Sequence, residues 1–308
     1  MTKISDNLLL PCGIEIKNRF LKSAMTEGLA NSDAIANNRH VNLYERWAKG
    51  GTGISVTGNV QIDHRYIERA GNVVIEGTQT NKSLAALANW SQAGKQNNTQ
   101  LWMQLSHAGR QTPFSINKKS VAPSVKPMPT LGGVLKFGVP EELSHSQILD
   151  IIDRFINAAE VAKQTGFTGV QLHSAHGYLL SEFLSPNINN RTDQWGGSIE
   201  NRSRLLISII DGIRAKVGNS FPISVKINSS DFQKGGFTHE ESIEVVKLLN
   251  LTSLDLLELS GGTYENFAAL EIDSLNLKKF KVTKPQRSTV VREAYFLKYA
   301  EEIKKFLS

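Results

Sequence analysis

The feature that most constrains the fold is a repeated alternation of short apolar runs with longer helical patterns. Six runs have the length and composition of buried strands, and they cover residues 20–25, 53–60, 99–105, 169–173, 223–227 and 254–259. Continuous apolar strands that alternate with helices indicate a parallel sheet that is covered on both faces. Two architectures have this pattern, an open doubly wound sheet and a closed (β/α)₈ barrel.

The stretches between the runs carry helix signals. Ser144 with Gln147, and Thr238 with Glu241, have the spacing of capping boxes. The predicted helices cover residues 33–49, 81–96, 144–165, 199–217, 238–250 and 292–307. A small hairpin is expected within 1–18, and the proline-rich segment 108–142 is long enough to be a lid over a site.

Polar residues at the ends of the strands favour the barrel over the open sheet. The first strand is not followed by the GxGxxG pattern of a dinucleotide-binding sheet. Reactive side chains instead follow the first, third, fourth and fifth runs, as expected when a barrel collects its site from several strand ends. We therefore predict an α/β fold, a TIM (β/α)₈ barrel of which about six β/α units are present.

Composition excludes several classes of protein. The chain has 308 residues, of which 40% are hydrophobic, and it carries a net charge of +6. Its one cysteine, Cys12, rules out disulfide frameworks, four-cysteine zinc sites and iron–sulfur clusters, so we expect that residue to serve packing. The lysines and arginines are dispersed, which indicates either a solvated basic face or a site that attracts phosphate-bearing ligands. We expect a cytoplasmic protein with no signal peptide, no membrane span and no nucleic-acid partner.

The richest stretch for chemistry is 167–204, in which His173, His176 and Tyr178 fall within six residues directly after a predicted strand. The two histidines could be zinc ligands together with His107, although no carboxylate stands at a recognised ligand spacing. They could also be hydrogen-bonded core residues, and Tyr178 could be a structural phenol.

The motifs in this stretch are long and ordered. They read His173-Ser-Ala-His176-Gly-Tyr178-Leu-Leu-Ser-Glu-Phe-Leu-Ser-Pro186, then Asn190-Arg191-Thr-Asp193, then Gly196-Gly197-Ser-Ile-Glu200-Asn201-Arg202. This series resembles the signature of the Old Yellow Enzyme family, the FMN-dependent ene-reductases and 2,4-dienoyl-CoA-reductase-like NAD(P)H:flavin oxidoreductases. The resemblance extends through Gln104-Leu-Ser-His107-Ala-Gly-Arg110 to Ser260-Gly-Gly262 and covers nearly the whole chain.

The resemblance implies a set of residues around the flavin. Ala24 and Thr26 would contact the ring, Gly58 would leave room for it, and Gln104 would hydrogen-bond its pyrimidine edge. Lys226 stands where the family usually has an arginine beside N1 and O2 of the flavin. A lysine there keeps the positive charge but loses the planar fork of donors.

The resemblance also assigns the catalytic residues. His173 and His176 would donate hydrogen bonds to the carbonyl oxygen of a small-molecule substrate, and Tyr178 would protonate the alkene carbon opposite the one that receives hydride. Two imidazole donors suit the negative charge that develops on that oxygen. A phenol in an apolar pocket is a suitable acid. FMN and NAD(P)H are the implied cofactors, and no metal is implied.

The chain departs from the family at its end. Residues 1–308 would form an FMN-binding oxidoreductase barrel domain that lacks the expected last two β/α units, whose loops commonly hold the phosphate. The alternatives to an active enzyme are therefore a noncatalytic truncated remnant and a half-protein that cannot hold FMN alone. A homo-oligomer or a complementing chain could supply the missing units. We expect mainly structural roles for four polar residues of the motif, Arg191, Asp193, Asn201 and Arg202.

Overall fold

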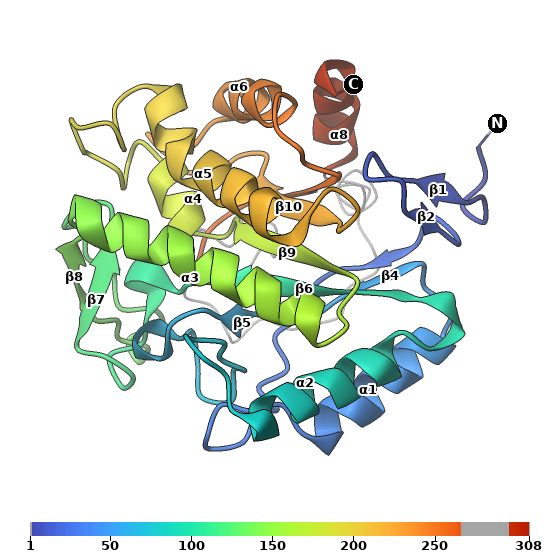
Figure 1. The fold of residues 1–308 in the computed structure, drawn as a ribbon. Helices are drawn as coiled ribbons and strands as arrows, with labels where there is room; N and C mark the ends of the chain where they lie inside the picture. The colour runs from blue at the N-terminus through green and yellow to red at the C-terminus, as the bar shows by residue number, and fades with distance from the viewer. Residues whose placement is uncertain (1, 266–295, 308) are drawn as a thin grey trace, which may run out of the picture.

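A curled parallel sheet organises the molecule. The computed structural model describes residues 2–265 and 296–307 (Figure 1). Seven strands form the sheet, and six of them lie in one continuous order: β3 (Leu21–Lys22), β4 (Ile54–Val56), β6 (Gln100–Ser106), β9 (Gly169–Ser174), β10 (Ile223–Asn228) and β11 (Leu256–Ser260). The seventh, the short β5 (Val60–Gln61), pairs with β6 off this path. All neighbouring pairs are parallel, which confirms the predicted α/β fold.

Strand register places the polar residues of the site at similar levels. His173 of β9 is the register partner of Lys226 of β10, and Lys226 is in turn the partner of Glu258 of β11. Gln104 of β6 pairs with Gln171 of β9, two residues before His173. Because side chains alternate between the two faces of a strand, these five residues share the inner face of the sheet.

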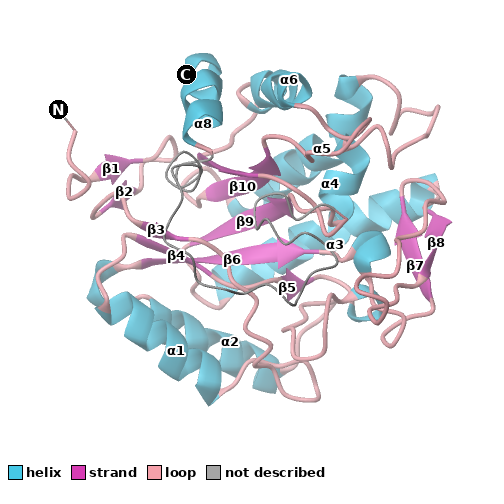
Figure 2. Cartoon of the chain, turned by 180° about the vertical axis from the view of Figure 1, so that it is seen from behind, coloured by secondary structure: helices cyan, strands magenta, loops and turns pink. Residues whose placement is uncertain are grey.

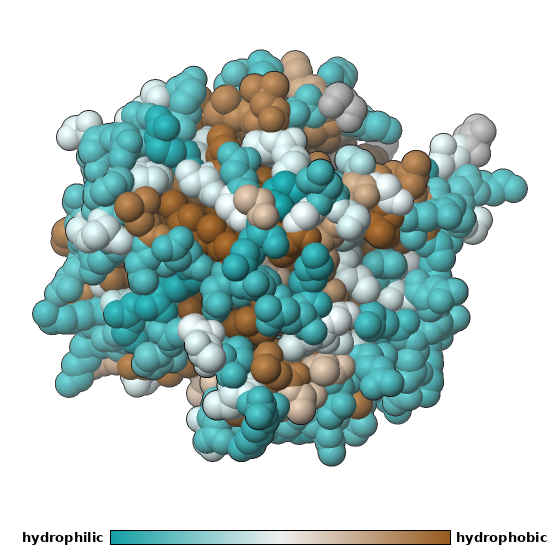
Figure 3. Space-filling view, in the orientation of Figure 1, coloured by the Kyte–Doolittle hydropathy of each residue, from teal (hydrophilic) through white to brown (hydrophobic). Residues whose placement is uncertain are grey.

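Helices cover the outer face of the sheet, as Figure 1 shows. They are α1 (Asn38–Lys49), α2 (Asn81–Gly94), α3 (His145–Gln164), α5 (Ile199–Val217), α6 (His239–Leu249) and α8 (Leu297–Ile303). The capping boxes at Ser144 and Thr238 are confirmed. On the face seen in Figure 3, the outer surface is mainly hydrophilic, with smaller apolar patches. Among the helices of the described residues, none is long and apolar enough to cross a membrane.

The inner face of the sheet has its own apolar cluster near the start of the strands. Ile54, Val56 and Trp102 are buried there with Leu10 and Ile16, which belong to the N-terminal hairpin segment. The hairpin pairs β1 (Leu8–Leu9) with β2 (Glu15–Ile16) and confirms the expected turn within 1–18. Cys12 is partly buried against the same cluster, in agreement with a packing role. The hairpin therefore covers the N-terminal end of the curled sheet.

The opposite end of the strands carries the segment that was expected to be a lid. Within 108–142 the structure contains a parallel pair, β7 (Lys119–Ala122) and β8 (Val139–Glu142). Figure 2 shows this pair at the end of the sheet away from the hairpin β1–β2. The carboxyl ends of the sheet strands therefore face the lid segment, which is where a barrel-type site is expected.

Several predicted elements differ in extent from those in the structure, among them the helix predicted at 33–49, which begins at Asn38. The strand predicted at 53–60 is split into β4 and the short β5 (Val60–Gln61), because the chain leaves the sheet around Gly58. The first strand, β3, has two residues instead of the predicted six. The short helix α4 (Leu179–Leu184) was not predicted, and residues 292–295 of the last predicted helix lie outside the described residues.

The two outermost strands, β3 and β11, each have a strand neighbour on one side only within the described part of the chain. The sheet curls enough for its ends to touch, because Ser23 Oγ donates a hydrogen bond of 2.8 Å to Glu258 Oε1. The described sheet is thus an incomplete barrel of six main strands.

Candidate functional site

The loop that follows β9 holds His176 in an unusual backbone conformation. Its φ of 62° lies in the left-handed region, which is costly for a residue with a Cβ. Two side chains from other elements stabilise it. The His176 N–H donates to Asn228 Oδ1 at 3.2 Å, and its carbonyl accepts from Gln111 Nε2 at 3.1 Å. Such a strained residue at the end of a strand is typical of functional sites.

His173 and His176 form a pair of neutral imidazoles. Their ring centroids lie 5.1 Å apart. Nδ1 of His173 accepts from the backbone N–H of Ala175 at 3.4 Å, which leaves its proton on Nε2. Burial lowers the pKa of His173 well below its usual value, and burial followed by the positive charge of Lys226 lowers the pKa of His176 to about 3. At neutral pH both rings are therefore uncharged. His176 Nε2 lies 2.6 Å from Oγ of Ser260, the last residue of β11.

Tyr178 lies against this pair. Its ring centroid is 4.6 Å from that of His173, and the residue is only 3% exposed. The hydroxyl donates to Glu68 Oε2 at 2.5 Å and lies 2.8 Å from the Tyr264 hydroxyl. Burial raises the pKa of Tyr178 well above its usual value, and the negative charge of Glu68 raises it further. The side chain is therefore a phenol and not a phenolate.

A polar network crosses the inside of the sheet below the histidines. Gln104 Nε2 donates to Gln171 Oε1, and Gln171 Nε2 donates to Glu258 Oε2, both at 2.8 Å. Lys226 Nζ lies 3.1 Å from Glu258 Oε1. The structure thus brings Gln104 and Lys226 into one network. Sequence reasoning missed Glu258, because one acidic residue within an apolar strand carries no signal of its own.

The other side of the site is made by the segment that follows β3. Ala24 packs against the inner apolar cluster. The Glu27 carboxylate accepts from the Gly58 N–H at 3.1 Å and from the Tyr44 hydroxyl. A Cβ on Gly58 would lie 2.4 Å from both Glu27 Oε2 and the carbonyl oxygen of Met25. The segment that contains Thr26 therefore rests on Gly58 and occupies the space that this glycine would leave for a ring.

Gln104 and Lys226 carry the kinds of group that one edge of FMN would require. The amide of Gln104 can both donate and accept, as the alternating groups of a pyrimidine edge require. Lys226 is 7% exposed and offers a cation to an oxygen acceptor at the same level. The described sheet ends with its sixth strand, so loops after a seventh and an eighth strand, which commonly hold phosphate, are not among the described residues.

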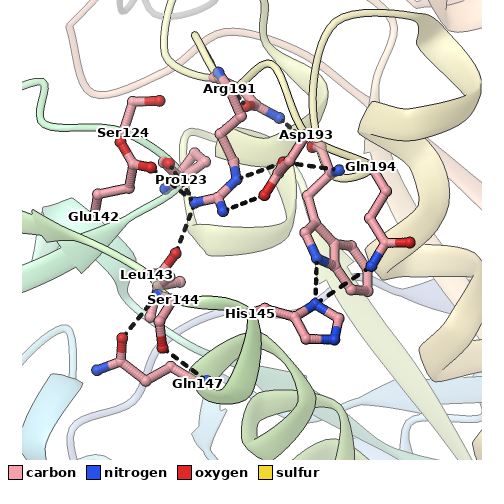
Figure 4. Close-up of polar contacts among 12 residues, drawn as sticks. Pro123, Ser124, Glu142, Leu143, Ser144, His145, Gln147, Arg191, Asp193 and Gln194 are labelled. Atoms are coloured by element: carbon pink, nitrogen blue, oxygen red, sulfur yellow. Dashed lines mark hydrogen bonds and ion pairs between the residues drawn. The ribbon is translucent and has the colours of Figure 1, made fainter.

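The long loop after α4 is fixed to the lid segment by ion pairs and hydrogen bonds, as drawn in Figure 4. The Arg191 guanidinium donates to Asp193 and to the carbonyls of Pro123 and Leu143, at 3.1 and 2.7 Å respectively. His145, at the start of α3, accepts from the Trp195 indole at 3.0 Å. These contacts support the structural role that was expected for Arg191 and Asp193.

The structure also bears on the alternative that His107, His173 and His176 form a zinc site. Within residues 2–265 and 296–307, the group of side chains that could hold a metal is Asp63, His64 and Glu76. His107 and the His173–His176 pair are not members of that group. The pair instead makes an edge-to-face ring contact, with centroids 5.1 Å apart.

Comparisons with known proteins agree with the resemblance found in the sequence. Residues 12–290 match the model of the NADH:flavin oxidoreductase / NADH oxidase family. The chain is 34% identical, over 96% of its length, to the NADH-dependent flavin oxidoreductase iliE of Hypocrea jecorina, and 31% identical, over 82%, to a cinnamate reductase of Clostridium sporogenes. The structure of a 2-naphthoyl-CoA reductase in complex with 2-naphthoyl-CoA superposes with a TM-score of 0.82 over 98% of the chain, at 26% identity.

The chain matches only part of each of these proteins. It spans 75% of the Hypocrea jecorina protein and 40% of the cinnamate reductase. It covers 44% of the 2-naphthoyl-CoA reductase chain. The similarity therefore includes the six-stranded part of the sheet and the residues at its strand ends.

Proposed function

The chain belongs to the NADH:flavin oxidoreductase / NADH oxidase family, and from this premise we propose that it reduces activated alkenes, such as enones, with FMN and NAD(P)H. Family membership places it among the flavin-dependent NAD(P)H oxidoreductases with a TIM-barrel-type fold. The name of the Clostridium sporogenes relative supports the class of substrate, because cinnamate has an alkene conjugated to a carboxylate.

The observation that carries the proposal is the pair of neutral imidazoles at the end of β9. His173 is buried, His176 is partly buried, and the two uncharged rings lie close together, so in the proposed complex an N–H group of each would donate to one oxygen atom of the substrate. Addition of hydride to an alkene conjugated with a carbonyl moves negative charge onto that oxygen. Preorganised donors in a buried site stabilise this charge and so lower the barrier.

Tyr178 completes the constellation as the proton donor. Hydride addition at the β-carbon leaves the α-carbon in need of a proton, and the un-ionised phenol beside His173 can supply it. When bound, FMN supplies the hydride that it has received from NAD(P)H. Gln104 and Lys226 would hold the pyrimidine edge of FMN, while Ala24, Thr26 and Gly58 would lie along its ring.

The proposal is tested by turnover. The purified 308-residue chain is incubated with FMN, NADH or NADPH, and 2-cyclohexenone or cinnamate, and the oxidation of the nicotinamide is followed. We expect oxidation that depends on the alkene and yields the saturated product. Alkene-independent oxidation, or none, would contradict the proposal.

A second candidate rests on the two sheet edges. We propose that residues 1–308 act as one barrel domain that needs further β/α units, supplied by a complementing chain or by a second copy of the chain in a homo-oligomer. Within residues 2–265 and 296–307, β3 and β11 each pair on one side only, which supports this, since unpaired strand edges can take additional strands. Analytical ultracentrifugation with and without FMN tests it, and a monomer that holds FMN would argue against it. We propose a cytoplasmic location, with no partner other than small molecules and such units.

A further inference from the structure

The hydroxyl of Tyr178 faces two side chains that no part of the proposed function uses. Glu68 Oε2 lies 2.5 Å from the Tyr178 hydroxyl, and the Tyr264 hydroxyl lies 2.8 Å from it. Glu68 comes from the segment between β5 and α2, and Tyr264 follows β11. Three segments that are far apart in the sequence therefore meet at one oxygen atom.

The position of Glu68 is fixed by its surroundings. Asn59, which is 7% exposed, donates to the same Glu68 oxygen that accepts from Tyr178. Asn72 holds both ends of the segment, because its Nδ2 donates to the Asn59 carbonyl at 3.2 Å and its Oδ1 accepts from the Arg69 N–H at 3.0 Å. Glu68 itself is partly exposed, so its carboxyl group can exchange protons with water while Tyr178 is buried.

This arrangement meets a chemical need of the proposed reaction. A phenol that gives its proton to carbon becomes a phenolate unless it regains a proton. A phenolate is disfavoured at Tyr178, because burial and the neighbouring carboxylate both raise the pKa of this residue. A group in direct contact with the phenol oxygen that delivers a proton to it returns Tyr178 to its neutral form.

We propose that Glu68 is the relay residue that passes a proton from solvent to Tyr178 during reduction of the alkene. The inference rests on the proposed function. In the step, the Tyr178 O–H bond breaks as the new C–H bond forms at the α-carbon of the substrate. The Glu68 carboxylate then takes a proton from a water molecule and passes it to the Tyr178 oxygen, so that the phenol is restored, Glu68 is again a carboxylate and the water is left as hydroxide.

Two features favour Glu68 over the other groups that face Tyr178. His173 contacts the Tyr178 ring rather than its hydroxyl. Burial raises the pKa of Tyr264, so this second phenol is a poor source of protons from water near neutral pH. Of these three groups only Glu68 is a carboxyl group, and a partly exposed carboxyl group exchanges protons with water rapidly.

The test compares Glu68→Gln with Tyr264→Phe, which removes the other partner of Tyr178. Enzyme loaded with FMN and pre-reduced with NAD(P)H is mixed anaerobically with 2-cyclohexenone in H₂O, in D₂O and in their mixtures. We expect Glu68→Gln to slow the alkene step by at least about tenfold, within the range of general acid catalysis. We expect a curved proton inventory for the wild type, as two protons move, and a linear one for Glu68→Gln.

Chemical rescue separates a relay from a structural role. Glu68→Ala opens a space beside the Tyr178 hydroxyl, and we expect added formate or acetate to restore the rate in proportion to its acid form. A wild-type rate in Glu68→Gln, or a slow Glu68→Ala that no small acid rescues, would overturn the relay.

A cofactor-free measurement keeps the inference testable if the chain fails to hold FMN, which would count against the proposed function alone. In protein with [ζ-¹³C]tyrosine, the Tyr178 signal is assigned with Tyr178→Phe. We expect Glu68→Gln to shift this signal and to lower the pKa of Tyr178, because the negative neighbour is removed. An unchanged signal would overturn the contact on which the relay depends.

Discussion

The two sides of the curled sheet differ in how far they are prepared for a ligand. On the β9–β10 side, His176 is held in its left-handed conformation by Asn228 and Gln111, and His173 and Tyr178 pack against each other. On the β3–β4 side, the strands are only two and three residues long. There the segment 25–27 rests on Gly58 through the Glu27 carboxylate.

From this difference we infer which half of the proposed site depends on the cofactor: the β9–β10 side is the substrate half and the β3–β4 side is the flavin half. Hydrogen bonds within the chain hold the side that is proposed to bind substrate, so we expect its geometry to exist before any ligand binds. A ring placed over Gly58, as proposed, would have to displace the segment 25–27, because the Glu27 carboxylate and the Met25 carbonyl fill the space beside that glycine. We therefore expect changes in the first half to affect chemistry, and changes in the second half to affect FMN binding.

The largest expected effect is that of Tyr178→Phe, on the β9–β10 side, on the rate of alkene reduction. Loss of the acid should slow alkene reduction by about 10²- to 10⁴-fold, the usual contribution of a general acid. Rapid-mixing kinetics of the alkene step measure it, and Tyr264→Phe serves as the matched removal of a neighbouring hydroxyl. A Tyr178→Phe variant that reduces the alkene as fast as the wild type would contradict the assignment of the chemical step to the β9–β10 side.

The next effect is that of replacing His173 and His176 with alanine together. Two lost donors should weaken the binding of phenolic ligands, whose oxygen mimics the developing anion, and should cost about 10²- to 10³-fold in turnover. Titration of the flavin charge-transfer band with a phenol reports on binding. Unchanged phenol affinity in the double variant would contradict the role of the pair.

A smaller effect is expected for Lys226, which belongs to β10 but is proposed to face the flavin. Lys226→Ala removes a charge-assisted hydrogen bond worth about 1.5–3 kcal/mol, so FMN affinity should fall by roughly 10- to 100-fold. Lys226→Arg keeps the charge and is expected to stay within a few-fold of the wild type. Equal affinities of the alanine variant and the wild type would show that Lys226 does not face the flavin.

The smallest expected effect is that of Glu27→Gln, and it tests the difference between the two sides of the sheet most closely. Glu27→Gln weakens the contacts that hold the segment 25–27 on Gly58, each worth about 0.5–1.5 kcal/mol. FMN affinity should therefore rise by a few-fold, while turnover at saturating FMN stays unchanged. Tyr44→Phe removes one of the same hydrogen bonds and should act in the same direction. Weaker FMN binding in both variants would mean that the segment already has the conformation that binds FMN.

The sequence was most informative where local pattern determines structure. The runs at 169–173 and 223–227 are apolar enough to require burial, and they coincide with β9 and β10 within one residue. The capping box at Ser144 depends only on residues within one helical turn, so it could be read directly. The motif around His176 was likewise recognisable, although its left-handed backbone was not.

The sequence was least informative where contacts join distant segments. Glu68 and Tyr264 meet at the Tyr178 hydroxyl from positions 110 and 86 residues away, and no spacing rule links them. Glu258 is isolated in an apolar strand, and only the sheet register places it beside Lys226. The roles assigned to Ala24, Thr26 and Gly58 remain predictions, because Glu27 and the Met25 carbonyl occupy the space beside Gly58 in this structure.

The measurement that tests this account most directly is a titration of FMN with the purified 308-residue chain, followed by visible absorption. We predict a saturable perturbation of the flavin bands that is weakened in Lys226→Ala and strengthened in Glu27→Gln. A spectrum that stays that of free FMN at every protein concentration would contradict the claim that this site binds the cofactor.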